Sequence, residues 1–264
     1  MEAVMGIGDE IIGTRHFARS PAKKPIRIVD NQMKTRTHEV WAYNPYINKD
    51  ALNLYPWNSS CRPYIDYGKS TVKHWAFRED YRVEPGEIYF SPQEQVEIAA
   101  MKDYIIIEPT VKGALQQNKA WPLQYWQDLV DANGSIPYKQ LVYNYQQPNL
   151  RGVEIVMVHS VRAWLIHVAA AIAVVTTEGG LHHAAAALDI PAVVLFSGFI
   201  SPNIMGYQLG NHRNLMHHYQ YEVEHNKSSC GLKVYCSQCH ANMDNLDVEQ
   251  VHRALFSLPV KEAR

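Results

Sequence analysis

Short apolar runs alternate with amphipathic segments from residue 103 onward, and this alternation is the strongest constraint on the fold of the chain. The runs YIIIEP (104–109), QLVYNY, VEIVMV, IAVVTT and PAVVLF are β-rich and short enough to be buried strands. Helix-forming segments separate them, such as PLQYWQDLVDANG (122–134), which opens with proline and ends in Asn-Gly. Steady alternation of this kind predicts an α/β fold with a doubly wound parallel sheet.

The first hundred residues have a weaker pattern. A short strand is expected over residues 2–7, followed by a helix that starts near Glu10. Further strands are expected over 25–30 (PIRIVD) and 39–47 (EVWAYNPYI). Residues 48–90 are rich in Tyr, Trp, Pro and Asn and show little periodicity, so irregular structure is expected there.

A helix is expected over SPQEQVEIAAM (91–101), where the first lobe ends. Ser91 can cap it, a proline takes the first helical position, and Glu94 completes a capping box. The sequence therefore predicts a small, irregular N-terminal lobe over 1–100 and a regular C-terminal lobe over 101–264. Ligands of such sheets bind at the carboxyl ends of the strands, often in the crevice between lobes.

Composition narrows the class of protein. With 47% hydrophobic and 19% charged residues the chain can bury a core, and its formal net charge of -1 gives no overall attraction to nucleic acid. No apolar stretch reaches the roughly 18 residues of a membrane span, and the acidic N-terminus does not have the features of a signal peptide. Four cysteines do not make a disulfide scaffold at this length. These features predict a soluble, cytoplasmic protein.

One segment, residues 11–38, is locally basic. It carries seven Lys and Arg residues against the single acid Asp30, a local charge of +6. The segment is either a solvated face or a patch that holds an anionic partner. In the second case its first four cations are candidate acceptor-binding residues: Arg15, Arg19, Lys23 and Lys24.

The stretch VVTTEGGLHHAAAALDIPAVVLF (174–196) places an acid, two glycines and two histidines between two strands. Gly179 and Gly180 would form the turn into a helix whose first N–H groups are unpaired, which attracts phosphate. Glu178 would face the same ligand and could accept hydrogen bonds from sugar hydroxyls. The alternative is an ordinary β–α turn that needs glycine only for its geometry.

Two further loops carry candidate residues. EPTVKGALQQNKAWP (108–122) follows a strand, and its Thr110 and Lys119 could donate to a phosphate. GIGDEIIGT (6–14) is a glycine turn before a helix. Its Asp9 is either an N-terminal helix cap, favoured there by the helix dipole, or a catalytic base.

These segments together resemble glycosyltransferase family 9, the family of the ADP-heptose:lipopolysaccharide heptosyltransferases. GIGDEIIGT is similar to the family's N-terminal Gly-Asp motif, and WAYNPYI to its Asn-Pro segment. IIIEPT and NKAWPLQYW are similar to its strand, phosphate loop and Lys-x-Trp-Pro helix entry. The most specific match is VVTTEGGLHHAAAALDIPAVVLFSGFISP, which resembles the signature Asp/Glu-x-Gly-x-x-His-x-x-Ala-Ala.

The resemblance implies a GT-B-like fold of two Rossmann-like lobes, the first of them trimmed in this shorter chain. It also implies metal-independent transfer of a sugar, with inversion, from a nucleotide-diphosphate donor to a hydroxyl acceptor, without a cofactor. Asp9 would be the general base. The donor would lie against seven residues: Thr110, Lys119, Glu178, Gly179, Gly180, Leu181 and His183.

The donor sugar and the acceptor stay open. Glu178 stands where Asp is commoner in the family, and the added methylene moves the carboxylate by roughly 1.5 Å, so the sugar can differ from heptose. The acceptor is expected to be an anionic glycan such as a lipopolysaccharide core. The basic segment suggests an alternative, DNA with hydroxymethylated bases, as some phage glycosyltransferases use. A non-catalytic module that binds a nucleotide or glycan is the third alternative.

A cysteine cluster lies near the C-terminus, in CGLKVYCSQCH. The Cys-x2-Cys spacing of Cys236 and Cys239 is typical of a zinc knuckle, but a second pair at the usual spacing is missing. Cys230 and His240 complete a candidate structural zinc site. Reduced, packed cysteines and a disulfide are the alternatives.

Overall fold

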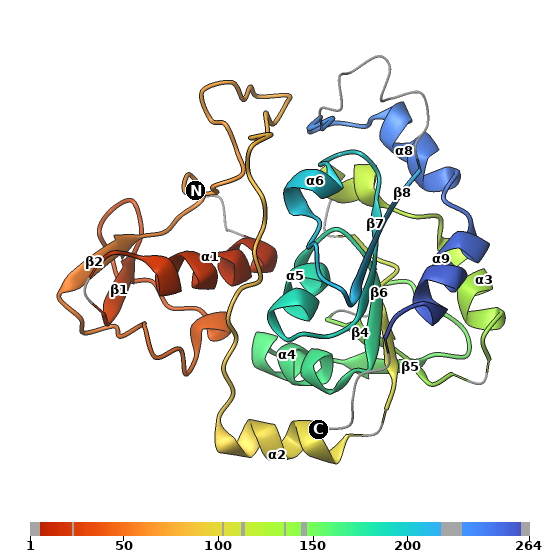
Figure 1. The fold of residues 1–264 in the computed structure, drawn as a ribbon, viewed down its shortest axis with the longest axis horizontal. Coiled ribbons are helices and arrows are strands. Elements are labelled where there is room, and N and C mark those ends of the chain that lie inside the picture. The colour runs from red at the N-terminus through yellow and green to blue at the C-terminus, as the bar shows by residue number, and fades with distance from the viewer. Residues whose placement is uncertain are drawn as a thin grey trace.

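The computed structural model contains two parallel sheets, one in each part of the chain (Figure 1). The structure describes residues 6–22, 24–101, 103–111, 114–134, 136–143, 147–217 and 229–259. The larger sheet has six strands in the order β5-β4-β3-β6-β7-β8, and each neighbouring pair is parallel. Its strands are β3 (Ile105–Ile107), β4 (Tyr138–Val142), β5 (Glu154–Met157), β6 (Ala173–Thr177), β7 (Ala192–Phe196) and β8 (His212–Met216).

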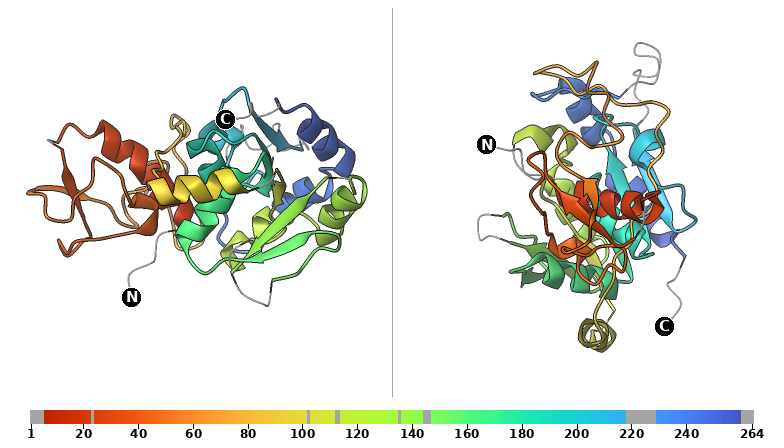
Figure 2. Two further views of the ribbon diagram at one scale, coloured as in Figure 1. Left: turned by 90° about the horizontal axis from the view of Figure 1, so that it is seen from below. Right: turned by 90° about the vertical axis from the view of Figure 1, so that its left-hand side faces the viewer.

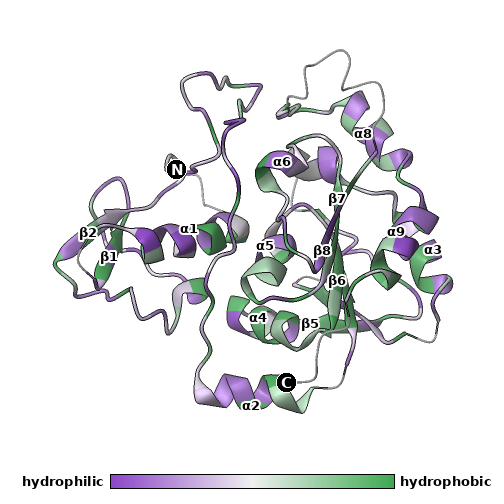
Figure 3. Ribbon diagram, in the orientation of Figure 1, coloured by the Kyte–Doolittle hydropathy of each residue, from purple (hydrophilic) through white to green (hydrophobic). Residues whose placement is uncertain are grey.

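Helices cover both faces of this sheet (Figures 1 and 2). Neighbouring residues of a central strand face opposite layers: Val174 packs into the core under α4 and α5, and Val175 into the core under α3 and α9. Because both faces are covered, the central strands read as continuous apolar runs in the sequence (Figure 3). The helices are α3 (Leu123–Asp131), α4 (Val161–Ala170), α5 (Gly180–Ala187), α6 (Pro202–Met205), α8 (Ser237–Asp244) and α9 (Val248–Phe256).

The first lobe is small and largely irregular, as expected. Its sheet pairs β1 with β2, and Phe17 of α1 packs edge-on against the rings of Trp41, Tyr55 and Trp57. The helix α2 lies between the two lobes in sequence and has the predicted capping box of Ser91. The elements are α1 (Ile7–Arg19), β1 (Ile26–Val29), the 3-10 turn η1 (Glu39–Trp41), β2 (Asn53–Pro56) and α2 (Pro92–Ala100).

One strand prediction for this lobe is wrong, and the end of another is helical. Over 39–47 the chain forms η1 (Glu39–Trp41) and turns instead of a strand, because the ring of His38 accepts a hydrogen bond from the Val40 amide at 3.2 Å and Tyr43 has a positive φ of 60°. The helix α1 already begins at Ile7, three residues before Glu10, so the end of the expected first strand is helical. Residues 1–5 lie outside the described residues.

The two lobes meet where the start of α1 packs on the start of α5 (Figure 1). A Cβ atom on Gly8 would come within 2.6 Å of the His183 ring, and one on Gly180 within 2.4 Å of the Ile7 side chain. Only glycine therefore lets the two helix ends approach this closely. Ile11 and Leu181 extend the contact into one continuous hydrophobic core.

The substitution Gly180→Ala tests this contact. The added methyl group would overpack the lobe junction, so we expect a loss of about 1–3 kcal/mol in the free energy of unfolding, measured with urea. Gly210→Ala is the matched control, because a Cβ atom there meets nothing within 4 Å. Equal stability of the two variants would contradict the packing described here.

Candidate active site

The candidate site lies at the centre of the large sheet, at the topological switch point, where the order in which strands are added reverses. Strands β3 and β6 are neighbours, and from them the chain runs outward to β4 and β5 on one side and to β7 and β8 on the other. Such a switch point leaves a crevice at the carboxyl ends of the two strands. Glu108 follows β3 and Glu178 follows β6, so both carboxyl groups are at this crevice.

Glu178 is buried and belongs to a charged cluster with residues from two other segments. The ammonium group of Lys119, at the end of the 3-10 turn η2 (Ala114–Lys119), forms a buried ion pair with its carboxylate. His183 Nε2 lies 3.6 Å from the other carboxylate oxygen, and His183 Nδ1 lies 2.9 Å from the Tyr207 hydroxyl. Burial alone would raise the pKa of Glu178, but Lys119 and His183 outweigh it and hold the pKa well below its usual range. Glu178 is therefore ionised at any physiological pH.

Asp9 accepts hydrogen bonds from three donors in the first lobe. The backbone N–H of Gly6 donates at 3.3 Å, so Asp9 caps α1 from position N3, whereas the sequence suggested that Asp9 itself is the N-cap residue. Arg62 Nε donates at 2.8 Å and the Tyr64 hydroxyl at 2.7 Å. The carboxylate is thus both a cap and the centre of a second polar cluster, and a catalytic role is compatible with that position.

Tyr64 belongs to the cluster around Asp9. Burial raises the pKa of Tyr64 well above its usual value, and the negative charge of Asp9 adds to that effect. Asp9 follows Gly8, and a Cβ atom on Gly8 would lie 2.6 Å from the His183 ring, whose Nε2 lies 3.6 Å from Glu178. The two polar clusters are therefore neighbours across the junction between the lobes.

The remaining predicted donor residues surround the start of α5. Gly179 is the N-cap of α5, and its carbonyl accepts from the His183 amide at 3.2 Å. Ile7 covers the side of Gly180 on which a Cβ atom would lie. Leu181 is buried in the core at the lobe junction, and Thr110 accepts a hydrogen bond from Gln147 at 2.9 Å. Their role in donor binding stays a prediction.

Glu108 is a candidate that sequence reasoning missed. Burial raises the pKa of Glu108 to about 7, partly offset by the hydrogen bond that the Thr176 hydroxyl donates at 3.1 Å. A carboxyl group with such a pKa can both take up and release a proton near neutral pH. The available signal was a glutamate placed directly after a buried strand.

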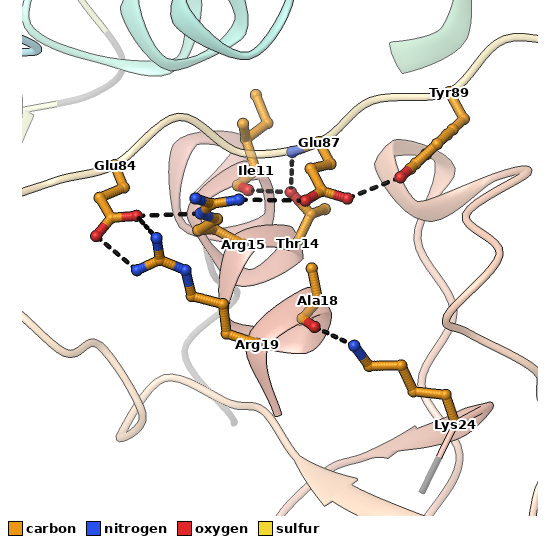
Figure 4. Close-up of polar contacts among 9 residues, drawn as sticks. All are labelled: Ile11, Thr14, Arg15, Ala18, Arg19, Lys24, Glu84, Glu87 and Tyr89. Atoms are coloured by element: carbon orange, nitrogen blue, oxygen red, sulfur yellow. Dashed lines mark hydrogen bonds and ion pairs between the residues drawn. The ribbon is translucent and has the colours of Figure 1, made fainter. Parts of the chain in front are cut away.

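Three of the four predicted acceptor-binding cations, Arg15, Arg19 and Lys24, already have partners within the first lobe (Figure 4). Arg15 pairs with Glu84 at 3.1 Å and Glu87 at 3.4 Å, and Arg19 pairs with Glu84 at 2.6 Å. Lys24 donates to the Ala18 carbonyl and lies over the Tyr46 ring. Lys23 lies outside the described residues. The expectation of a solvated, structural face fits these contacts, and an acceptor-binding role for the four cations stays a prediction.

The predicted cysteine site is partly assembled. The sulfur atoms of Cys230, Cys236 and Cys239 lie within 4.8 Å of one another, and all three side chains are buried free thiols. A hydrogen bond from Cys239 is the main cause that lowers the pKa of the Cys230 thiol. His240 is not part of this group: its ring stacks on Tyr235 at 4.6 Å.

Glu178, His182 and His183 form a second group of side chains that can bind metal ions. One oxygen or ring nitrogen from each lies within 4.8 Å of the others. The ammonium group of Lys119 already pairs with Glu178, and its charge opposes a metal cation there. His182 is fully buried, and neither ring nitrogen has a hydrogen-bond partner among the described residues. It is therefore a core residue behind the site.

An apolar cavity of about 1140 Å³ lies elsewhere, between α2, α9 and the starts of strands β3 and β6. Its lining includes Ile105 and Ala173, which are the first residues of those strands. Because parallel sheets bind ligands at the carboxyl ends of their strands, we place the site at the charged cluster and not in this cavity.

Structural comparison shows the fold class. The chain is 14% identical to the glycosyl transferase family 9 protein of Veillonella parvula, with 97% of this chain and 94% of that chain covered and a TM-score of 0.59. It also matches E. coli ADP-heptose lipopolysaccharide heptosyltransferase II at 18% identity. This match covers 65% of this chain and 53% of the transferase, with a TM-score of 0.48. A third match is the iron-containing dodecameric glycosyltransferase TibC of enterotoxigenic E. coli. The identity is 16%, the match covers 66% of this chain and 48% of TibC, and the TM-score is 0.47.

The chain spans about half the length of these E. coli transferases and nearly the whole length of the Veillonella protein. No family model matches the sequence, and a search of curated proteins found no match. The α/β architecture with a parallel six-stranded sheet, shared with a family 9 glycosyltransferase structure, confirms the predicted GT-B-like fold class. Among the described residues, no helix is long and apolar enough to cross a membrane.

Two buried histidines behind the site predict a loss of stability in acid. Burial lowers the pKa of His212 to about 4 and that of His182 well below its usual value, so both stay neutral in the folded protein. In the unfolded chain they take up protons below a pH of about 6.5. Each histidine is therefore expected to lower the free energy of unfolding by about 1–3 kcal/mol as the pH drops from about 6.5 toward 4. Glu108 acts in the opposite direction between about pH 7 and 4.5, because its raised pKa means that the folded protein takes up this proton first.

Urea unfolding at several pH values measures this loss. His212→Gln should lose less stability in acid than the wild type, because glutamine does not titrate and only the share of His182 remains. His252→Gln, on the outer helix α9, is the matched control and should keep the wild-type pH dependence. Equal pH dependence of His212→Gln and the wild type would contradict the prediction.

Proposed function

We propose that the chain is a glycosyltransferase of the family 9 type, which transfers a sugar from a nucleotide-diphosphate donor to a hydroxyl acceptor. The observation that carries the proposal is the contact between the starts of α1 and α5. Gly8, the neighbour of Asp9, lies against the His183 ring, and His183 lies 3.6 Å from Glu178, which pairs with Lys119. A base and a cation on opposite sides of a lobe junction suit attack on one side of a sugar and departure of a diphosphate on the other.

Lys119 would stabilise the leaving group. Cleavage of the bond between sugar and diphosphate builds negative charge on the phosphate, and a buried ammonium group stabilises that charge more strongly than water does. Donor binding would then separate Lys119 from Glu178, and the freed carboxylate would accept hydrogen bonds from sugar hydroxyls. Lys119 supplies the positive charge that a metal ion supplies in other transferases, which is why we propose that transfer is metal-independent.

Asp9 would take the proton of the acceptor hydroxyl as it attacks. Arg62 and Tyr64 already donate to its carboxylate, so an acceptor must displace one of them. Attack from the side of Asp9, opposite the diphosphate, gives inversion at the sugar. Among acceptors, we favour a glycan over a DNA backbone, because Glu84 and Glu87 already pair with Arg15 and Arg19.

The substitution Asp9→Asn tests the base. The amide keeps the size of the side chain but cannot take up a proton, so we expect transfer to be abolished while the nucleotide sugar still binds. Donors are first identified among UDP-, GDP- and ADP-sugars by thermal stabilisation, and turnover is then measured with lipopolysaccharide core and with hydroxymethylated DNA.

Asp50→Asn, on an exposed turn of the same lobe, is the control and should keep full activity. Unchanged turnover of Asp9→Asn would remove the base assignment. Donor binding without turnover by the wild-type protein on any acceptor would favour the non-catalytic binding module.

The substitution Lys119→Ala tests the donor site. Loss of the charge-assisted contact should weaken donor binding by about 1–3 kcal/mol, measured by calorimetry. Because the single change leaves Glu178 buried without its partner, the double variant with Glu178→Gln separates a folding defect from a binding defect. Lys139→Ala, which removes a lysine paired with Glu154 on β5, is the control. Equal donor affinity of Lys119→Ala and wild type would contradict the assignment.

A further inference from the structure

We propose that Cys230, Cys236 and Cys239 bind one thiophilic divalent cation, such as Zn²⁺, and that this ion fixes the loop that positions the two polar clusters of the site. The loop comprises residues 230–236 and is called the cysteine loop here. The metal site stands on its own geometry, whereas the consequence for Lys119 and Asp9 rests on the proposed function.

The three thiols have the arrangement of a thiolate site. Cys236 is the N-cap of α8 and Cys239 lies three residues further in its first turn, which turns both sulfurs to one side. Cys230 reaches them from the other end of the cysteine loop, with its sulfur 3.4 Å from that of Cys236. Sulfurs around a tetrahedral Zn²⁺ lie about 3.8 Å apart, because each Zn–S bond is about 2.3 Å long. The observed group, all within 4.8 Å, can close on one ion with small shifts.

The cysteine loop holds the residue next to Lys119. Asn118 is buried at 2% exposure and makes three hydrogen bonds to this loop. Its side-chain amide donates to the carbonyls of Leu232 at 3.0 Å and Val234 at 2.7 Å, and its carbonyl accepts from the Cys236 amide at 2.8 Å. Because Lys119 is the next residue, the position of its ammonium group depends on the shape of the loop.

The same loop holds the segment of the first lobe that carries the partners of Asp9. The Trp75 amide donates to the Gly231 carbonyl at 2.8 Å, and the Lys233 amide donates to the Lys73 carbonyl at 2.9 Å, so the two stretches pair antiparallel. Gly231 has a φ of 65°, and a Cβ atom there would lie 2.0 Å from the Trp75 carbonyl oxygen. Figure 1 shows this segment of the first lobe and the start of α8 approaching each other above α6.

This contact continues toward the site. Residues 65 and 77 form an antiparallel bridge directly after the stretch that pairs with the cysteine loop. Tyr64 stacks on the Phe77 ring, with centroids 6.3 Å apart, and donates to Asp9. A cation on the three thiolates would therefore hold one loop that supports Lys119 on one side and Tyr64 on the other.

The first test is metal content. The full chain, purified without a metal-affinity tag, is analysed by inductively coupled plasma mass spectrometry. We expect close to one metal ion per chain, retained through gel filtration, with at least a tenfold loss in Cys236→Ser and in Cys239→Ser. Cys61→Ser is the matched control, because this cysteine lies outside the cluster and should not change the metal content.

The second test is hydrogen exchange of the wild-type chain before and after chelation, which does not depend on any variant folding. Loss of the ion should raise exchange at least tenfold at the amides of Trp75, Lys233 and Cys236, while residues 139–142 of β4 keep their protection. Addition of Zn²⁺ should restore the protection.

Three results would overturn the proposal. A chain without bound metal that does not take up Zn²⁺ would remove the site, and so would a disulfide between two of the three cysteines in the purified protein. Loss of the ion without any change in exchange would remove the positioning role. Neither test uses sugar transfer, so a failure of the proposed function would leave both readouts intact.

Discussion

The packing of α1 on α5 is the contact on which the candidate site depends. Gly8 and Gly180 let the first turns of the two helices touch, and no larger residue fits at either position without a shift. Asp9 follows Gly8 on α1, and Glu178 precedes the turn into α5. The close approach of the helices therefore brings an acid of the first lobe to the charged end of β6. A few added ångströms between the helices would separate the two polar clusters.

The buried Lys119–Glu178 ion pair is not explained by a contribution to folding stability. Both groups are almost completely buried, and taking two charges out of water costs more than their attraction usually returns. A pair of apolar residues would stabilise this position at least as well. The pair is explained if each charge has a second partner during the reaction: a diphosphate for Lys119 and sugar hydroxyls for Glu178. The fully buried His182 behind it stays neutral, so it adds no further charge that would compete for these partners.

The sequence predicted the large sheet well because each of its central strands is buried on both faces. Val174 and Val175 belong to different cores, so neither could be polar. The turn at Glu178 was predictable for a related reason, since glycines and an acid between apolar runs mark a β–α turn at a strand end. Strand β8, with the sequence HRNLM, lies at the sheet edge and is only partly buried, so it lacks the apolar pattern that reveals the other strands.

The partners of the site residues could not be predicted in this way. Arg62 and Tyr64 come from an irregular segment, and they reach Asp9 across 53 and 55 residues of chain. Arg15 looked like part of a free basic patch, yet its partner Glu84 lies 69 residues away. Such pairs are set by how the irregular segments of the first lobe fold back on α1, and a local hydrophobic pattern does not show that. The strand predicted over 39–47 was wrong because the His38 ring caps a turn there, an interaction that a hydrophobic pattern does not show.

The central claim is that a donor diphosphate binds at the junction of the lobes, between Lys119 and Asp9. A crystal structure of the protein with the nucleoside diphosphate that stabilises it most tests this directly. The account predicts phosphate oxygens within about 3 Å of Lys119 Nζ, with the ion pair to Glu178 opened and the Asp9 carboxylate facing the sugar side. A diphosphate bound elsewhere, for example in the apolar cavity beside α2 and α9, would contradict it.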